Sequence, residues 1–154
     1  MSLGPSVVSL DEQDFRPVDA ARWARLATAV LVAEGIGKGA ELNITFIDSA
    51  EMAVLNEEHM DGDGPTDVLS FPLDDEDSTV FDGQDRLLGD VLICPEVVDR
   101  QAPDRYDDEM ALMVVHGVLH ILGHDHFEPE ETAVMKAAEA RHLDVWRASS
   151  SEQP

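Results

Sequence analysis

Four of the chain's six histidines fall within residues 116–126. His116 and His120 are four residues apart, so an α-helix places both imidazoles on one face, about one turn apart. His126 follows six residues later and, on an unbroken helix, lies roughly 240° around from His120. Gly123 stands between them, and glycine readily takes the left-handed conformation that ends helices. The stretch therefore predicts two metal ligands on a helix, a glycine stop, and a third ligand, His126, on the returning loop.

The three imidazoles predict a catalytic zinc ion, one per chain. Neutral imidazole suits zinc, and three protein ligands leave one tetrahedral position for water or substrate. Bound zinc lowers the pKa of that water to about 7 and polarises a carbonyl or phosphoryl oxygen. Structural zinc sites usually have four ligands, often cysteines, but Cys94 is the only cysteine here. We expect Cys94 to lie in the core at the end of a strand rather than to serve as a fourth ligand.

The spacing of the three histidines is also that of the long metallopeptidase motif HExxHxxGxxH. In those enzymes a glutamate follows the first histidine and acts as the general base, whereas this chain has Gly117. The missing glutamate counts against a peptidase, although a zinc hydrolase of another kind stays open. A helix with three buried histidines and no metal is the remaining alternative, which the glycine between them disfavours.

Two residues beside the third ligand are candidates for supporting roles around the metal. Asp125 is expected either to accept the second N–H of a ligand imidazole or to stabilise the loop. We expect His124 to be a packing or surface residue, and a role of its imidazole in proton transfer is the alternative. His59 and His142 are expected to be structural or exposed. Beyond a metal-bound water, the sequence does not identify the catalytic group.

The composition is strongly acidic. There are 33 Asp and Glu residues against 10 Lys and Arg, which gives a net charge of −23. Such a surface repels nucleic acid at long range, especially at low salt. Any RNA-binding function therefore requires a local basic patch, the metal or a partner. The charge itself favours solubility or adaptation to salt, with a basic partner such as a ribosomal protein as the alternative.

The length fits a single domain. We expect this domain, a zinc-dependent hydrolase, over residues 1–147, followed by a disordered tail over residues 148–154. A single cysteine excludes an internal disulfide, and no stretch has the pattern of a signal peptide or of a membrane span. These features predict a cytoplasmic protein with no membrane partner.

Hydrophobic periodicity predicts strands mixed with helices. Strands are expected over residues 6–10, 41–47, 68–71 and 89–94, and helices over residues 18–34, 49–58, 110–122 and 129–147. Residues 74–85 are acidic and are expected to form an exposed excursion. The metal helix is almost entirely apolar apart from its histidines and Gly117, so it should be buried on most sides. Because strands and helices do not alternate regularly, the pattern favours an α+β fold.

Four segments together resemble the YbeY family, bacterial endoribonucleases of ribosomal RNA maturation. They are Leu55-Asn56, residues 65–72 (PTDVLSFP), residues 89–94 (GDVLIC) and residues 116–126 (HGVLHILGHDH). They stand in the family's order, and the histidine motif H-G-x-L-H-x-x-G-x-D-H is highly specific. The resemblance spans about residues 42–147. It implies an α+β fold with a small mixed four-stranded sheet packed with helices and the metal-binding helix in the core.

The resemblance also implies a zinc ion held by His116, His120 and His126. It further implies cleavage of single-stranded RNA, maturation of the 3′ end of the small-subunit ribosomal RNA, and a role in ribosome quality control. The implied partners are ribosomal RNA and the ribosome or its proteins. Thr66, Asp67 and Ser70 are candidates to line the groove beside the metal, although loop capping explains Thr66 and Asp67 equally well.

One position departs from the family pattern. Many members carry an arginine four residues after the asparagine that corresponds to Asn56, and this chain has Met60 there. An arginine would supply positive charge to a phosphoryl transition state. Without it, the metal must carry more of that charge, or one of Arg86, Arg100 and Arg105 must reach the site.

The expected reaction is metal-assisted phosphodiester cleavage, with either water or the 2′-hydroxyl of the RNA as nucleophile. The alternatives are a zinc metallopeptidase-like hydrolase and a non-enzymatic ribosome assembly factor whose zinc only shapes a binding surface. The acidic surface and Met60 favour the assembly factor.

Overall fold

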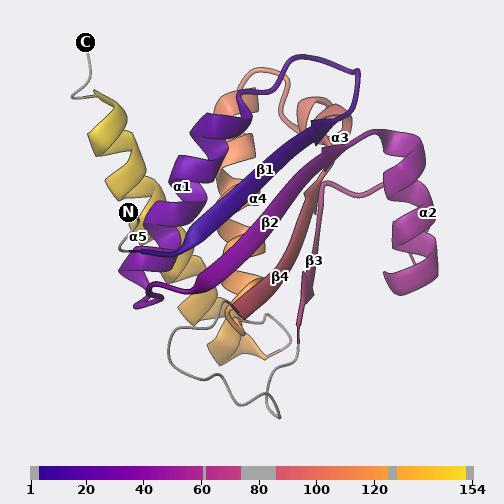
Figure 1. Ribbon diagram of the computed structural model, residues 1–154. Helices are drawn as coiled ribbons and strands as arrows, with labels where there is room; N and C mark the ends of the chain where they lie inside the picture. The colour runs from indigo at the N-terminus through magenta and orange to yellow at the C-terminus, as the bar shows by residue number, and fades with distance from the viewer. Residues whose placement is uncertain (1–3, 61, 74–85, 125–127, 152–154) are drawn as a thin grey trace.

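The computed structural model describes residues 4–60, 62–73, 86–124 and 128–151, and it combines one β-sheet with a layer of helices (Figure 1). Along the chain the elements are β1 (Ser6–Glu12), α1 (Ala20–Ala33), β2 (Ala40–Ile47), α2 (Ser49–Met60), β3 (Val68–Pro72), β4 (Arg86–Ile93), α3 (Pro95–Gln101), α4 (Tyr106–Ile121) and α5 (Pro129–Ser151). Strands and helices do not alternate regularly in this part of the chain, so the predicted α+β class is confirmed.

The strands form a mixed four-stranded sheet in the order β1-β2-β4-β3. β2 pairs in parallel with β1 and with β4, and β3 pairs antiparallel with β4. Leu42, Ile44 and Phe46 alternate along β2 and are buried on one face, as the sequence predicts. β4 begins at Arg86, three residues before the predicted strand, because Arg86 pairs with Ala40 of β2.

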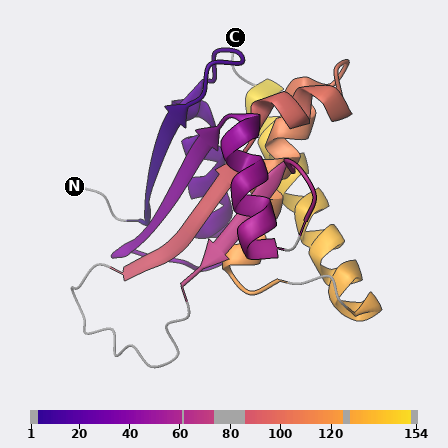
Figure 2. The same cartoon turned by 90° about the vertical axis from the view of Figure 1, so that its right-hand side faces the viewer.

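Helices α1, α4 and α5 lie on one face of the sheet, and α2 lies beside β3 (Figure 1). The turned view shows α4 between the sheet and α5 (Figure 2). Nine residues of α4 are buried. The helix that carries His116 and His120 therefore lies in the hydrophobic core, as its apolar composition predicts.

Gly117 allows α4 to approach the sheet closely. A Cβ atom at this position would lie 2.6 Å from Val91 Cγ1 and 3.3 Å from Val68 Cγ2. The Ser70 hydroxyl donates a hydrogen bond to the Gly117 carbonyl at 3.0 Å. The part of α4 next to His116 is thus held directly against β3 and β4.

Helix α3 is absent from the elements expected from the sequence. Pro95 follows an apolar strand, so the sequence indicates only that the strand ends there. In the structure Pro95 occupies the first turn of α3. Proline is tolerated at this position because the first N–H groups of a helix have no acceptor inside the helix. The seven residues of α3 include only a few apolar side chains, so they show no clear helical period. A short helix of this kind leaves little periodic signal.

Helix α5 is longer than predicted and ends at Ser151. The prediction that a disordered tail begins at residue 148 is therefore wrong for residues 148–151, which belong to α5. No glycine or proline interrupts the chain between Pro129 and Pro154, so the helix can continue past residue 147. Residues 152–154, like the expected excursion over residues 74–85, lie outside the described residues. Although α5 is long, neither it nor any other described helix is apolar enough to cross a membrane.

Candidate metal centre

The C-terminal end of α4 closes at the glycine predicted to stop it. Gly123 has a φ of +100°, in the left-handed region that favours glycine. The Gly123 N–H donates to the His120 carbonyl at 3.0 Å, and the His124 N–H donates to the Leu119 carbonyl at 3.0 Å. These two bonds form a Schellman motif, which satisfies the last carbonyls of a helix and turns the chain away from its axis. The predicted helix stop is confirmed.

His116 and His120 lie together on one face of α4. Their ring centroids are 4.6 Å apart, and their ring planes meet at 73°. Both residues are half-buried, although the helix around them is largely buried. The spacing of four residues therefore produces the pair of neighbouring imidazoles that the sequence predicts, at the margin of the core.

A carboxylate that the sequence pattern did not reveal holds one of these rings. Nδ1 of His116 lies 2.5 Å from Oε2 of Glu139, across the contact between α4 and α5. The two side chains are 27% and 14% exposed, so the pair is largely shielded from water. A carboxylate that accepts the Nδ1–H leaves Nε2 as the nitrogen able to bind a metal, and such partners fix the orientation of ligating histidines. For His116, the carboxylate partner in the structure is Glu139.

The sequence contains one indication that the Glu139 side chain has a partner. It lies four residues after Met135 and three before His142, which are both buried, so on a helix it shares their face. An acidic residue on a buried helix face requires a partner. The partner itself is hidden in the sequence, because His116 lies 23 residues away on another helix.

His124 and His142 meet at Glu34, the residue that follows the last turn of α1. Nε2 of His142 lies 2.8 Å from Oε2 of Glu34, Nη2 of Arg141 lies 3.3 Å from the same oxygen, and Nε2 of His124 lies 3.8 Å from Oε1. Burial raises the pKa of Glu34, but hydrogen bonds and charges from His142, His124 and Arg141 outweigh it and lower the pKa overall. His142 is thus structural, as predicted, and His124 contacts the cluster that joins α1 to α5.

The residues at the start of β3 serve the local structure. Oδ1 of Asp67 accepts hydrogen bonds from the Val68 N–H at 2.7 Å and from the Thr66 hydroxyl at 3.3 Å. Loop capping therefore accounts for Thr66 and Asp67, while Ser70 ties β3 to α4. Cys94 is fully buried, in the core position that the sequence predicts.

Two predicted site residues, Asp125 and His126, lie outside the described residues, as does the side chain of Met60. Within the part of the chain that the structure describes, no three histidine, cysteine or acidic side chains form a group able to hold a metal ion. The three-histidine zinc site therefore stays a prediction. The described donors fit it, because two imidazoles lie side by side and one of them has the carboxylate partner that metal-binding histidines usually have.

Comparisons with known proteins give the same family as the motifs. A family model described as Endoribonuclease YbeY matches residues 9–147. Proteins named Endoribonuclease YbeY from Salinispora tropica and Acidothermus cellulolyticus are 42% and 43% identical, over 94% and 85% of this chain and 98% and 85% of those proteins. A solution structure from Thermotoga maritima matches with a TM-score of 0.60 and 26% identity over 96% of both chains. This chain belongs to the YbeY endoribonuclease family.

Proposed function

We propose that this chain is a zinc-dependent endoribonuclease that cleaves single-stranded ribosomal RNA. Its membership of the YbeY family supports the class of reaction. The observation that carries the proposal is the His116–Glu139 pair beside His120, which is the arrangement of a metal ligand held by a carboxylate. We place the activity in the cytoplasm, in maturation of the 3′ end of the small-subunit ribosomal RNA and in ribosome quality control, with the ribosome or its proteins as partners.

In the proposed centre, His116, His120 and His126 hold one zinc ion. When bound, zinc supplies positive charge and Lewis acidity at a phosphoryl oxygen. Glu139 accepts the Nδ1–H of His116, which selects the tautomer with its lone pair on Nε2 and restrains the ring. The turn at Gly123 takes the chain off the helix axis directly after α4, so a ligand beyond it is not confined to the far side of the helix.

The metallopeptidase alternative requires a glutamate in place of Gly117. Any side chain there begins with a Cβ atom 2.6 Å from Val91 Cγ1, so the helix would have to move away from the sheet. The close packing of α4 against β4 therefore disfavours a base at this position. It supports a reaction in which the metal and the RNA itself provide the reacting groups.

The substitution His120→Ala tests the proposal. We expect the variant to lose bound zinc and to lose cleavage of a labelled single-stranded RNA. Asp108→Ala, which removes an exposed side chain near the other end of the same helix, should keep both. Zinc is measured by mass spectrometry, and the cleaved ends identify the nucleophile, since a 2′,3′-cyclic phosphate indicates attack by the 2′-hydroxyl.

Two outcomes would contradict the proposed nuclease activity. A folded His120→Ala variant that cleaves RNA at the wild-type rate would show that the paired imidazoles are not part of the reaction. Wild-type protein that binds zinc but leaves single-stranded RNA intact would favour the non-enzymatic assembly factor, and normal ribosomal RNA processing in cells that carry His120→Ala would support that alternative further.

A further inference from the structure

Strand β1 forms one border of the sheet (Figure 1). It pairs with β2 along its whole length without a bulge, and the described strands include no partner for its other side. One row of its backbone N–H and C=O groups therefore faces away from the sheet. Edge strands are usually blunted by charged side chains, proline or a bulge. β1 carries charges only at its end, at Asp11 and Glu12, whereas Val8 and Leu10 are 41% and 51% exposed.

Helix α1 runs antiparallel along β1 and covers only its helix-facing side. The Ser9 hydroxyl donates a hydrogen bond to the carbonyl of Ala20, the first residue of α1, at 2.9 Å. At the other end of the helix, Val32 lies beside the chain that leads into β1, since a Cβ atom at Gly4 would lie 3.8 Å from Val32 Cγ2. β1 and α1 together therefore make up this side of the molecule, which we call the β1 border.

The flank of α1 at the β1 border is made of small side chains. Arg22 pairs with Asp107 of α4 at 3.5 Å, so the flank of α1 that carries Arg22 faces α4. Helix geometry puts Ala24 and Thr28 on the opposite flank, and both are half-buried. The Thr28 hydroxyl donates to the Ala24 carbonyl at 2.8 Å, so it requires no further acceptor. A second helix is thus able to approach this flank closely.

Charge distinguishes the β1 border from the rest of the molecule. β1 carries two acidic residues, and α1 carries Arg22 and Arg25 but no acidic residue. The two elements are therefore neutral together, in a chain whose net charge is −23. Two copies of an acidic chain repel each other least where the local charge is smallest. The charge of this border therefore favours a second copy over a basic partner.

The sequence of β1 is self-complementary in an antiparallel pair. If Ser9 lies opposite Ser9 of a second copy, Val8 of each copy lies opposite Leu10 of the other. The exposed apolar side chains then meet in cross-strand pairs on the open face of the sheet. In this register each acidic residue of β1 faces an uncharged one; the pairs are Asp11 with Val7 and Glu12 with Ser6.

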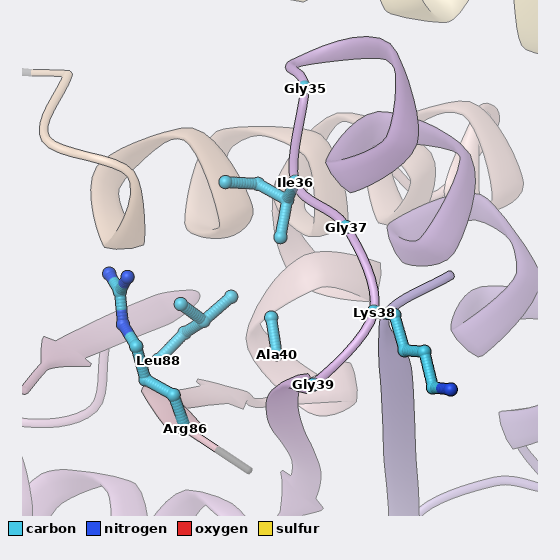
Figure 3. A pocket seen from close by; sticks show the side chains of 8 residues that line it. All are labelled: Gly35, Ile36, Gly37, Lys38, Gly39, Ala40, Arg86 and Leu88. Atoms are coloured by element: carbon cyan, nitrogen blue, oxygen red, sulfur yellow. The ribbon is translucent and has the colours of Figure 1, made fainter. Parts of the chain in front are cut away.

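A basic residue lies at the start of β1, at the opposite end from its acidic residues. Lys38 is exposed and precedes β2, whose Glu41 pairs with Ser6 at the start of β1. Figure 3 shows the Lys38 side chain pointing away from Arg86, to the side of the loop on which β1 begins. In the antiparallel register, Lys38 of each copy is therefore near Glu12 of the other.

We propose that this chain forms a homodimer in which the β1 strands of two copies pair antiparallel about a two-fold axis. The two four-stranded sheets become one continuous sheet, and the two α1 helices lie side by side on it. The proposal does not depend on the nuclease function. β3, at the opposite border, keeps its contact with α4 beside His116, so both proposed metal centres lie away from the interface.

Sedimentation velocity over a wide range of protein concentration tests the proposal. We expect the wild type to shift from monomer to dimer as the concentration rises. The shift should occur at lower protein concentration when NaCl is added, because screening weakens the repulsion between two acidic copies. Val8→Lys should weaken dimerisation about tenfold or more, since the two-fold axis places the substituted side chain in two cross-strand pairs.

Val54→Lys is the matched control. Val54 is also an exposed valine, at 51%, but it lies on α2, beside β3 at the opposite border of the sheet. The substitution changes the net charge as Val8→Lys does, and the variant should dimerise as the wild type does. Circular dichroism of both variants verifies that they are folded.

Disulfide cross-linking tests the register. Residues directly opposite each other in an antiparallel pair have Cα atoms about 5 Å apart, which a disulfide spans, whereas diagonal neighbours are about 7–8 Å apart. We therefore expect a mixture of the Val8→Cys and Leu10→Cys variants to form a cross-linked dimer under mild oxidation, and each variant alone to stay largely uncross-linked. The native Cys94 is fully buried and should not react.

Three results would overturn the inference. The first is wild-type protein that stays monomeric at the highest concentration and salt. The second is Val8→Lys protein that dimerises as tightly as Val54→Lys protein, and the third is Val8→Cys protein that cross-links alone as fully as the mixture does. If monomeric wild-type protein instead binds a basic, strand-forming peptide that Val8→Lys protein does not bind, the β1 border serves another partner and the homodimer is equally excluded.

Discussion

At the scale of single residues, the proposed centre depends on how one imidazole is held. Glu139 accepts the Nδ1–H of His116 in a pair that is largely shielded from water. Loss of such a partner typically lowers metal affinity by about 10- to 100-fold, because the ligand ring is less basic and less restrained. We therefore expect Glu139→Gln to weaken zinc binding by about 10- to 100-fold, measured by competition with a chromophoric chelator.

Asp144→Asn is the control for this substitution, since it removes an exposed carboxylate from the same helix. It should bind zinc as tightly as the wild type. Urea unfolding of the metal-free proteins separates a change in zinc affinity from a change in stability. Wild-type zinc affinity in Glu139→Gln would remove the main support for His116 as a ligand.

The sequence predicts the parts of this site that depend on local spacing. The pairing of His116 with His120 and the stop at Gly123 follow from helix geometry and from the conformational freedom of glycine. The partners Glu139 and Glu34 do not follow, because they lie 23 and 108 residues from the histidines that they contact. Local patterns determine which side chains share a face, whereas tertiary packing determines which faces meet.

At the scale of elements, the approach of α4 to the sheet depends on Gly117. Alanine normally stabilises a helix interior by about 1 kcal/mol relative to glycine. Here the added Cβ would lie 2.6 Å from Val91 Cγ1, and overpacking in a core typically costs about 1–3 kcal/mol. We expect Gly117→Ala to lower the free energy of unfolding by about 1 kcal/mol, measured by urea denaturation.

Gly37→Ala provides the comparison, because a Cβ at Gly37 would meet nothing within 4 Å. Its effect on the free energy of unfolding should stay within about 0.5 kcal/mol, as for most surface substitutions. A Gly117→Ala variant that is more stable than the wild type would show that α4 can shift away from β4 without loss.

Glu34 makes a joint between α1 and α5, and this joint is sensitive to acid. Its contacts with His142 and Arg141 hold the pKa of Glu34 below its ordinary value of 4.5, against the effect of burial. A carboxyl with a lowered pKa stabilises the fold at pH values above its unfolded pKa, and that contribution is lost as the pH falls through the folded pKa.

We therefore expect the difference in unfolding free energy between wild type and Glu34→Gln to be largest near neutral pH. It should shrink as the pH falls below 4.5, because the wild-type carboxyl then takes up a proton. Urea unfolding at a series of pH values from about 7 to about 3 measures this difference. A difference that is constant over the series would show that the charge of Glu34 does not contribute to the joint.

The sequence predicts a helix or strand where the apolar residues of that element recur at a regular spacing. The alternation of Leu42, Ile44 and Phe46 identifies β2 because one face of the strand is buried. α3 has too few residues to show a period. The start of β4 at Arg86 depends on pairing with Ala40, which no local pattern records.

At the scale of the whole molecule, the net charge of −23 imposes two requirements. The fold must tolerate repulsion among its own acidic residues, and RNA must find a place where the sign of the potential is locally reversed. Composition predicts the first requirement directly. The second depends on tertiary structure, since side chains far apart in the chain, such as Lys38 and Arg86, come to line one pocket only because β2 pairs with β4.

Added salt should therefore stabilise the fold. The Debye length falls from about 30 Å at 0.01 M salt to about 10 Å at 0.1 M, so added NaCl weakens the repulsion within the protein. We expect the melting temperature of the metal-free protein to rise by a few degrees over this range. The variant Glu130→Gln/Glu131→Gln, which removes two exposed charges, should show a smaller rise. A melting temperature that falls with salt would mean that ion pairs such as Arg16–Asp99 outweigh the net repulsion, and the acidic surface would then not limit the stability of the fold.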